Sequence, residues 1–267
     1  MRAAVLGSPV GHSLSPVLHR AAYAALGLDW TYDALEVTAE GLPGFLAGVD
    51  GTWAGLSLTM PLKQAVLPLL DEADALVGVT GSANTVVLRS GRREGHNTDV
   101  HGMVAALREA GVGHVDRAAV LGTGATAASA LAALHDLGAH HVRVLGRDPA
   151  KVAAVGAVAQ ALGTELRSAE LHPLELEDRW PQLVVSTVPS GALDAFAAAS
   201  DPSGDVPVLL DVVYAPWPTP LAAAYAAAGG VVVPGTAMLL HQAAAQVELM
   251  TGQEAPLEVM RAALAGA

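Results

Sequence analysis

A glycine-rich turn between a short apolar strand and an alanine-rich helix constrains the fold of this chain more than any other feature. The run Ala118–Leu121 has the pattern of a buried strand, and it leads directly into the sequence GTGATA at residues 122–127. In this strand–turn–helix context, the spacing G-x-G-x-x-A is the fingerprint of a dinucleotide-binding unit. Gly122 permits the tight turn, Gly124 lets a pyrophosphate approach the backbone, and Ala127 lets helix and strand pack closely. The amino end of the helix then offers unpaired N–H groups to the anion.

The residues at the tip of the next strand predict which dinucleotide is bound. The strand Val142–Leu145 leads through Gly146 to Arg147 and Asp148, which precede a proline. An arginine at this position suits the 2′-phosphate of NADP, whereas an acid that faces the ribose suits NAD. Lys151, one helical turn beyond Arg147, can face the same phosphate, and Asp148 has the pattern of a helix N-cap. We therefore predict NADP, with NAD favoured instead if Asp148 turns toward the ribose.

Along the whole chain, short aliphatic runs alternate with longer segments rich in alanine and leucine. The predicted strands are Ala3–Leu6, Thr31–Val37, Gly55–Leu58, Ala83–Arg89, Ala118–Leu121, His141–Leu145, Leu183–Thr187, Val208–Val213 and Val231–Val233. The predicted helices are Pro16–Leu26, Thr38–Ala47, Met60–Leu70, Asp74–Val79, Gly102–Ala110, Ala125–Leu137, Pro149–Leu162, Pro220–Ala228, Ala237–Thr251 and Pro256–Leu264. Strands separated by helix-length segments call for right-handed crossovers and mostly parallel sheets. The fold class is therefore α/β.

A polar, turn-rich segment at residues 90–97 interrupts the middle of this alternation and predicts a joint between two domains. We expect an N-terminal α/β domain at 1–99 and a Rossmann-type dinucleotide-binding domain at 100–234. The helices at 235–267 have no following strand, and we expect them to pack back on the first domain. Ser15 before Pro16 is expected to cap the first helix.

The acidic balance of the chain excludes two classes of partner. Acidic residues outnumber basic ones by 26 to 14, which gives a formal net charge of −12. Such a surface repels phosphate backbones and anionic lipid, so we expect neither a nucleic-acid nor a membrane partner. A local basic pocket can still bind a small anionic substrate.

The chain has no cysteine, which excludes disulfides, thiol nucleophiles and cysteine-ligated metal sites. The ten histidines show no metal-ligand spacing, so no metal is predicted. The apolar start meets Gly7 too early for a signal peptide, and no apolar run has the length of a membrane span. We therefore expect a cytoplasmic protein.

Four polar clusters lie at the ends of strands predicted in the first domain, where a parallel sheet presents its loops to a ligand. They are Gly11–Pro16, Ser57–Lys63, Gly81–Thr85 and His96–Asp99. Each cluster alone has an ordinary structural interpretation, such as a helix cap, a turn residue or a solvated lysine. Their recurrence at strand ends in a chain with few charged residues predicts a binding site.

The clusters resemble, in order and spacing, the successive motifs of shikimate dehydrogenases. The later segments resemble the same family, and the resemblance covers essentially the whole chain. The segments that carry it are GHSLSP (11–16), SLTMPLK (57–63), ANT (83–85), NTD (97–99), STVPSG (186–191), DVVYAP (211–216), TPL (219–221) and GTAMLLHQA (235–243).

The resemblance implies the reversible, NADP(H)-linked reduction of 3-dehydroshikimate to shikimate, a step of aromatic amino-acid biosynthesis. It also implies two α/β domains with the substrate in the cleft between them. Ser13 and Ser15 match the hydroxyls that hold the substrate carboxylate, with Tyr214 nearby. The partners of the ring hydroxyls match Thr59, Asn84 and Gln242, and the catalytic pair matches Lys63 and Asp99. The cofactor site matches Gly122, Gly124, Ala125, Arg147, Thr187, Gly235 and Met238, in addition to Lys151.

The implied reaction assigns a role to the catalytic pair. Hydride transfer to a ketone builds negative charge on its oxygen, so a donor must lie beside that oxygen. Lys63 can supply this donor as an ammonium group and act as general acid, while Asp99 holds it in place.

Two positions depart from the usual family pattern. Ser57 stands where the family often has asparagine, which shortens or removes one contact. Gly146-Arg147-Asp148 replaces the usual Asn-Arg-Thr, which removes one polar contact on the adenine side.

The sequence leaves alternative functions open. A quinate or aminoshikimate dehydrogenase that uses NAD or NADP would have the same fold. A non-catalytic shikimate sensor would not need the acid–base pair. A methylenetetrahydrofolate dehydrogenase would share the two-domain plan and a lysine, but it would not need paired serines after the first strand. A monomer and a homodimer are both compatible with the sequence.

Overall fold

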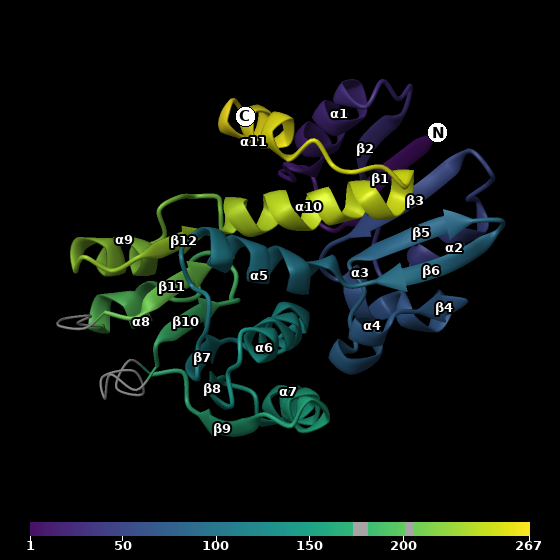
Figure 1. Cartoon of the computed structure of the whole chain (residues 1–267). Coiled ribbons are helices and arrows are strands. Elements are labelled where there is room, and N and C mark those ends of the chain that lie inside the picture. Colours follow the sequence, from purple (N-terminus) through teal and green to yellow (C-terminus); the bar gives the residue numbers. More distant parts are fainter. Residues whose placement is uncertain (173–180, 201–205) are drawn as a thin grey trace. The chain divides into compact units, whose positions relative to one another are not determined.

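The computed structural model describes residues 1–172, 181–200 and 206–267 (Figure 1). The chain divides into two units, one formed by Met1–Gly102 with Leu239–Ala267 and the other by Met103–Met238. Each unit contains one six-stranded sheet. The chain passes between the units within helix α5 (Thr98–Glu109) and within helix α10 (Gly235–Thr251).

The sheet of the first unit is mixed, whereas the sequence predicts mostly parallel sheets. Its strands are β1 (Arg2–Gly7), β2 (Thr31–Glu36), β3 (Trp53–Leu58), β4 (Glu72–Ala73), β5 (Thr85–Arg89) and β6 (Arg92–His96), in the order β2-β1-β3-β5-β6-β4. Strands β1, β2 and β3 are parallel, but β5 runs antiparallel to both β3 and β6. The helices of this unit, besides parts of α5 and α10, are α1 (Ser15–Ala25), α2 (Leu42–Ala47), α3 (Leu62–Ala65), η1 (Leu67–Leu69), α4 (Ala75–Thr80) and α11 (Leu257–Ala265).

The sequence predicts that the polar segment at residues 90–97 is a joint between two domains, and this prediction is wrong. The segment forms the turn of a hairpin and the strand β6, which pairs with β5 inside the first sheet. Ser90 and Gly91 both have positive φ, 51° and 76°, as a two-residue hairpin turn requires. Strand β6 has the charged sequence RREGH and therefore shows no alternation of apolar and polar residues. It lies near the edge of its sheet, where polar side chains can face water.

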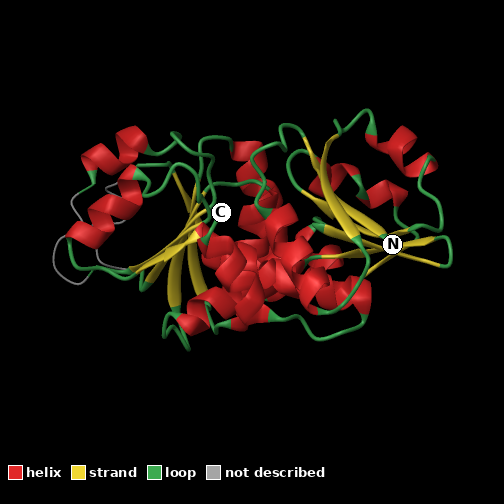
Figure 2. Ribbon diagram, turned by 90° about the horizontal axis from the view of Figure 1, so that it is seen from above, coloured by secondary structure: helices red, strands yellow, loops and turns green. Residues whose placement is uncertain are grey.

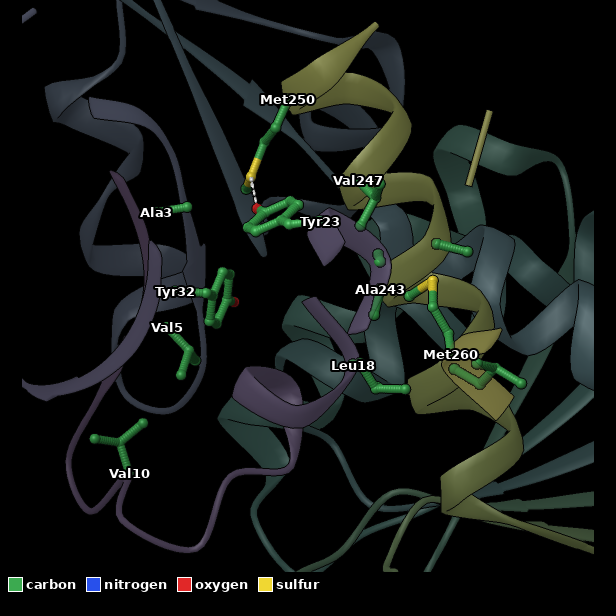
Figure 3. Close-up of a cluster of buried hydrophobic side chains, with 13 residues drawn as sticks. Ala3, Val5, Val10, Leu18, Tyr23, Tyr32, Ala243, Val247, Met250 and Met260 are labelled. Carbon is green, nitrogen blue, oxygen red and sulfur yellow. Dashed lines mark hydrogen bonds between the residues drawn. The ribbon is translucent and has the colours of Figure 1, made fainter. Parts of the chain in front are cut away.

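Two hydrophobic clusters lie in the first unit. One packs β1, β2 and α1 against α10 and α11, and its members include Ala3, Leu18, Tyr23, Val247 and Met250 (Figure 3). The other gathers residues of β1, β3, β5 and the helices α2 to α4. The C-terminal helix α11 packs directly on α1. Residues from both ends of the chain therefore share one core.

The second unit is a parallel, doubly wound sheet with helices on both faces (Figure 2). Its strands are β7 (Arg117–Leu121), β8 (His141–Leu145), β9 (Glu165–Ala169), β10 (Leu183–Ser186), β11 (Val208–Asp211) and β12 (Val232–Pro234), in the order β12-β11-β10-β7-β8-β9. Its helices include α6 (Ala125–Asp136), α7 (Pro149–Leu162), α8 (Asp194–Ala199) and α9 (Pro220–Ala227). The predicted α/β class with a Rossmann-type domain is confirmed.

Two elements of this unit are not among the predicted ones. Strand β9 has the sequence ELRSA and lies at an edge of the sheet, so it lacks a continuous apolar pattern. Helix α8 is a short segment of six residues. Among the described residues, no helix is long and apolar enough to cross a membrane.

Candidate active site

The four polar clusters of the first unit meet at the edge of its sheet that is formed by the carboxyl ends of β1 and β3. Strands β1 and β3 are parallel and end there, with Leu6 paired to Leu58. Strand β5 is antiparallel to β3 and therefore begins at that edge, where Thr85 pairs with Ser57. Strand β6 reverses direction again and ends beside it, with His96 paired to Thr85. The alternating strand directions thus bring segments that are far apart in the sequence to one place.

Lys63 and Asp99 form an ion pair at this edge. Lys63 lies on the short helix α3, and its Nζ donates to Asp99 Oδ2 at 2.5 Å. The two side chains retain 15% and 5% of their exposure, so the pair is largely shielded from water. Helix α5 begins at Thr98, earlier than predicted, which puts Asp99 in the first turn. There the Asp99 amide donates to Asn97 Oδ1 at 3.1 Å, which fixes the backbone that carries the carboxylate.

Asn84 is buried beside this pair and bonds to the other oxygen of Asp99. Its Nδ2 donates to Asp99 Oδ1 at 2.8 Å and to Thr98 Oγ1 at 2.9 Å. Its Oδ1 accepts from the Thr98 amide at 2.8 Å. Gln242 approaches from helix α10, with its Oε1 3.4 Å from Asn84 Nδ2. Lys63, Asn84, Asp99 and Gln242 thus form one polar cluster.

The two serines expected to hold a carboxylate lie at the amino end of α1. Ser15 is the first residue of the helix and Leu14 is its N-cap, so the predicted capping role of Ser15 is wrong. The Ser15 amide instead donates to Ser13 Oγ at 3.3 Å. The first helical turn contains no acidic residue, so its positive dipole end is not neutralised there. Both hydroxyls therefore lie in surroundings that suit an anion.

Thr59 follows β3 and is held close to the end of β1. Its amide donates to Leu6 O at 2.9 Å. A Cβ built on Gly7 would lie 2.3 Å from Thr59 Cγ2, so glycine at this position makes the close approach possible. Tyr214, in contrast, belongs to the second unit, where it is half-buried after β11.

The glycine-rich turn of the second unit has the geometry that its sequence predicts. Gly122 has φ +112°, and a Cβ there would lie 2.6 Å from Thr187 Oγ1. Thr187 is held against the turn because its Oγ1 donates to Leu121 O at 2.9 Å. Gly124 is the N-cap of α6 and has open space around it, with no side chain capping the helix. Ala125 begins the helix, and its amino end is therefore accessible to an anion.

The tip of β8 and the first turn of α7 carry two exposed basic residues and one acid, which caps α7. Arg147 and Lys151 are exposed. Asp148 is the N-cap of α7, with its Oδ1 accepting from the amides of Ala150 at 3.0 Å and Lys151 at 3.4 Å. The capping role predicted for Asp148 is thus confirmed. A carboxylate in this role is turned toward the helix, which leaves Arg147 as the charged residue facing outward at the strand tip.

The last two predicted cofactor residues begin helix α10. Gly235 lies so close to β11 that a Cβ would be 2.2 Å from Val212 O, a backbone atom that cannot move aside. Met238, one turn later, is buried. Among the described residues, no group of three or more histidine, aspartate or glutamate side chains is placed to hold a metal ion.

The structure also shows buried polar residues that the sequence analysis did not select. Tyr32 Oη donates to Ser57 Oγ at 2.6 Å, and Ser57 Oγ donates to Gln246 Oε1 at 2.7 Å. His19 stacks on Tyr32 with ring centroids 4.0 Å apart. Burial lowers the pKa of His19 to about 3 and raises that of Tyr32 above its ordinary value. One signal was available, because Gln246 lies four residues after Gln242 and hence on the same helix face.

Sequence profiles of two shikimate dehydrogenase domains match this chain. The substrate binding domain matches residues 5–86, and the C-terminal domain of shikimate 5'-dehydrogenase matches residues 235–265. The chain is 39% identical over 278 residues to the shikimate dehydrogenase (NADP(+)) of Citrifermentans bemidjiense, covering 98% of this chain and 94% of that one. It is 36% identical over 262 residues to the protein of the same name from Halobacterium salinarum, covering 97% of both chains.

Solved structures of shikimate dehydrogenases are also similar to this chain. The shikimate dehydrogenase of Mycobacterium tuberculosis is 43% identical, with a TM-score of 0.92, and the match covers 100% of this chain and 99% of that one. The shikimate 5-dehydrogenase of Thermus thermophilus, in complex with NADP(H) and shikimate, is 34% identical with a TM-score of 0.85. That match covers 100% of this chain and 99% of the Thermus chain.

Proposed function

Because the chain belongs to the shikimate dehydrogenase family, we propose that it catalyses the reversible, NADP(H)-dependent reduction of 3-dehydroshikimate to shikimate. The observation that carries the proposal is the shielded pair of Lys63 and Asp99, with Nζ and Oδ2 2.5 Å apart. A sensor that only binds its ligand does not need a proton donor with a carboxylate to orient it. We assign substrate binding and catalysis to residues 1–99 with 235–267, and cofactor binding to residues 100–234 together with Gly235 and Met238 at the start of α10.

The substrate is held by hydroxyl and amide groups of the proposed site. Ser13 and Ser15 bind the carboxylate, a role supported by their place at the amino end of α1. Thr59, Asn84 and Gln242 bind the ring hydroxyls. Tyr214 is assigned to the carboxylate end on the basis of the family pattern.

NADPH, when bound, supplies the hydride. Lys63 donates a proton to the ketone oxygen as negative charge builds there, and this donor lowers the barrier most when it is already oriented. Asp99 supplies that orientation through the contact of its Oδ2 with Lys63. In the reverse direction Lys63 accepts the proton of the hydroxyl. Asn84 bonds Asp99 Oδ1, so the carboxylate is held from both sides.

The residues of the second unit fit a phosphorylated dinucleotide. A side chain at Gly122 would fill the turn, while the space around Gly124 is open and the start of α6 lacks a side-chain cap. Arg147 and Lys151 are exposed and can bind the 2′-phosphate. Ala125, Thr187, Gly235 and Met238 complete the proposed cofactor site.

A matrix of two substrates and two cofactors tests the proposal. Turnover is measured for shikimate and quinate, each with NADP⁺ and with NAD⁺. We expect the highest kcat/KM for shikimate with NADP⁺. A preference for quinate would identify a different member of the family, and tight shikimate binding without turnover would identify a sensor.

A further inference from the structure

The buried side chain of Asn84 lies at the end of a series of hydrogen bonds that begins at Tyr32 on strand β2 and runs through Ser57, Gln246 and Thr85. Thr85 Oγ1 donates to Asn84 Oδ1 at 2.9 Å, and Gln246 Nε2 donates to Thr85 Oγ1 at 2.9 Å. Gln246 Nε2 also donates to the main-chain oxygen of Asn84 at 3.2 Å. Gln246 therefore holds Asn84 twice, directly at its backbone and through Thr85 at its amide.

Which atom donates and which accepts in each of these hydrogen bonds follows from groups that can only donate or only accept. A main-chain carbonyl can only accept, so the end of Gln246 that faces Asn84 O is the NH₂ group. The other end, Oε1, must then accept, and it does so from Ser57 Oγ at 2.7 Å. The Ser57 hydroxyl in turn accepts from Tyr32 at 2.6 Å. Because Gln246 donates to Thr85, the Thr85 hydroxyl is free to send its own proton to Asn84.

His19 adds a second donor at the start of the chain. Its Nε2 lies 3.2 Å from Gln246 Oε1, and its Nδ1 lies 3.3 Å from the hydroxyl of Tyr23. An amide oxygen can only accept, so the proton of the neutral ring is on Nε2. His19, Ser57, Thr85 and Gln246 are all buried, which removes water as a competitor for these bonds.

The orientation of the Asn84 amide, fixed by these hydrogen bonds, determines how Asn84 contacts the catalytic pair. With its Oδ1 accepting from Thr85 and from the Thr98 amide, its Nδ2 must face the Asp99 carboxylate, which can only accept. A rotated amide would bring an oxygen against that carboxylate. Hydrogen bonds in such a chain polarise one another, so each donor upstream strengthens the Asn84 contact with Asp99 Oδ1. Asp99 Oδ2 is then left for Lys63.

We propose that Thr85 and Gln246 are positioning residues for the reaction, which act by holding the amide of Asn84 toward Asp99. This inference rests on the proposed function. Neither residue touches the ion pair itself, so both act through Asn84. Ser57, which stands where the family often has asparagine, supplies one of the two hydrogen bonds that Gln246 Oε1 accepts, and His19 supplies the other.

The test compares variants that remove the hydrogen-bond donors of Thr85 and Gln246 but keep the approximate volume of each side chain. Thr85→Val and Gln246→Met are made singly and together, and kcat/KM for shikimate is measured with saturating NADP⁺. We expect Thr85→Val to lose about tenfold, because one oriented hydrogen bond at the site is lost. The double variant is expected to be no worse than the more impaired single variant, since both changes interrupt one chain.

Two further variants separate positioning from stability. Thr85→Ser keeps the hydroxyl and is expected to retain kcat/KM to within about twofold. Thr251→Val makes the same chemical change on α10, where Thr251 Oγ1 bonds Val247 O at 2.7 Å. It is expected to lower Tm without lowering kcat/KM. The Kd of NADP⁺ is expected to be the same in all variants.

Three results would overturn the inference: wild-type kcat/KM in Thr85→Val, losses that multiply in the double variant, or losses in Thr251→Val as large as those in Thr85→Val. The wild-type chain is measured in the same assay. If it does not turn over shikimate, the proposed function itself is rejected, so the two failures are distinguishable.

Discussion

The chain contains two lysines, Lys63 and Lys151, and the proposed site uses both. The other basic side chains that can stay charged at neutral pH are arginines, which do not readily give up a proton. Lys63 is shielded and paired with Asp99, whereas Lys151 is exposed on α7. The same residue type therefore occupies two very different environments.

Replacement of each lysine separates chemistry from cofactor binding. Lys63→Ala is expected to lower kcat for shikimate oxidation by about 10³-fold, because the group that accepts the proton of the reacting hydroxyl is lost. The Kd of NADPH is expected to stay unchanged. Lys151→Ala is the matched control, with kcat retained and a raised KM for NADP⁺. Steady-state kinetics and fluorescence titration of NADPH measure both effects, and near-normal turnover of Lys63→Ala would remove Lys63 from the mechanism.

Arg147 is expected to decide between the two nicotinamide cofactors. Arg147→Ala should raise KM for NADPH by about tenfold, because a charge-assisted hydrogen bond to the 2′-phosphate is lost. KM for NADH should change by less than about twofold, since NADH lacks that phosphate. Equal effects on both cofactors would mean that Arg147 does not bind the phosphate.

Individual residues could be predicted where their partners are local. The cap formed by Asp148 depends on the two following amides and was readable from the sequence. The bond between Thr85 and Gln246 joins residues 161 positions apart and depends on how α10 packs over β5. No local pattern contains that information.

At the scale of elements, the turn between β7 and α6 limits what residue 122 can be. Gly122→Ala would place a side chain at φ +112° and against Thr187 Oγ1. We expect a loss of about 1–2 kcal/mol in the free energy of unfolding and a more than tenfold rise in the Kd of NADP⁺.

Gly163→Ala is the matched control for this substitution. Gly163 ends α7 with φ +70° and has open space around it. Its replacement should cost about 1 kcal/mol of stability and leave the Kd of NADP⁺ unchanged. Chemical denaturation and cofactor titration of both variants provide the comparison. If Gly163→Ala weakened NADP⁺ binding as much as Gly122→Ala, the effect of Gly122 would be attributable to stability alone.

The buried parallel strands were predicted because they are continuous apolar runs, as in β7 and β10. The strands missed were β4, β6 and β9, which lie at or beside sheet edges and carry charged residues. The turn at Ser90 and Gly91 was a sequence signal for β6 that the polar composition outweighed. Edge elements are thus the part of this fold that periodicity alone does not identify.

At the scale of the molecule, the order of the two units and their α/β class followed from the sequence, because crossovers and the fingerprint turn are properties of connected segments. The mixed sheet of the first unit did not follow. It depends on one hairpin between β5 and β6, and that hairpin sets the edge where Asn84 and Asp99 meet.

Global stability is expected to fall in mild acid because His19 is buried in its neutral form. Its pKa is about 3 in the folded protein and about 6.5 when unfolded. Below pH 6.5 the unfolded chain takes up a proton that the folded chain does not, so stability is lost as the pH falls toward 3. At about pH 5 this amounts to about 2 kcal/mol.

His19→Gln retains an N–H donor toward Gln246 but has no titrating ring. Its free energy of unfolding should therefore depend less steeply on pH between about 5 and 7 than that of the wild type. Urea denaturation at the two pH values measures the slope. Identical slopes would show that His19 does not contribute to the acid sensitivity.

The cap of α7 also bears on how readily this chain could change its coenzyme. The acid at the strand tip accepts hydrogen bonds from two amides, so recruiting Asp148 to a ribose would remove the N-cap of its own helix, at a cost of about 1 kcal/mol. The neighbouring position is crowded, because a Cβ on Gly146 would lie 2.5 Å from Thr123 Cγ2, so an acid there would require the Thr123 side chain to shift. Selection for NAD would have to remodel the strand tip and the glycine-rich turn together, and a single substitution at Arg147 would yield an enzyme that is poor with either coenzyme.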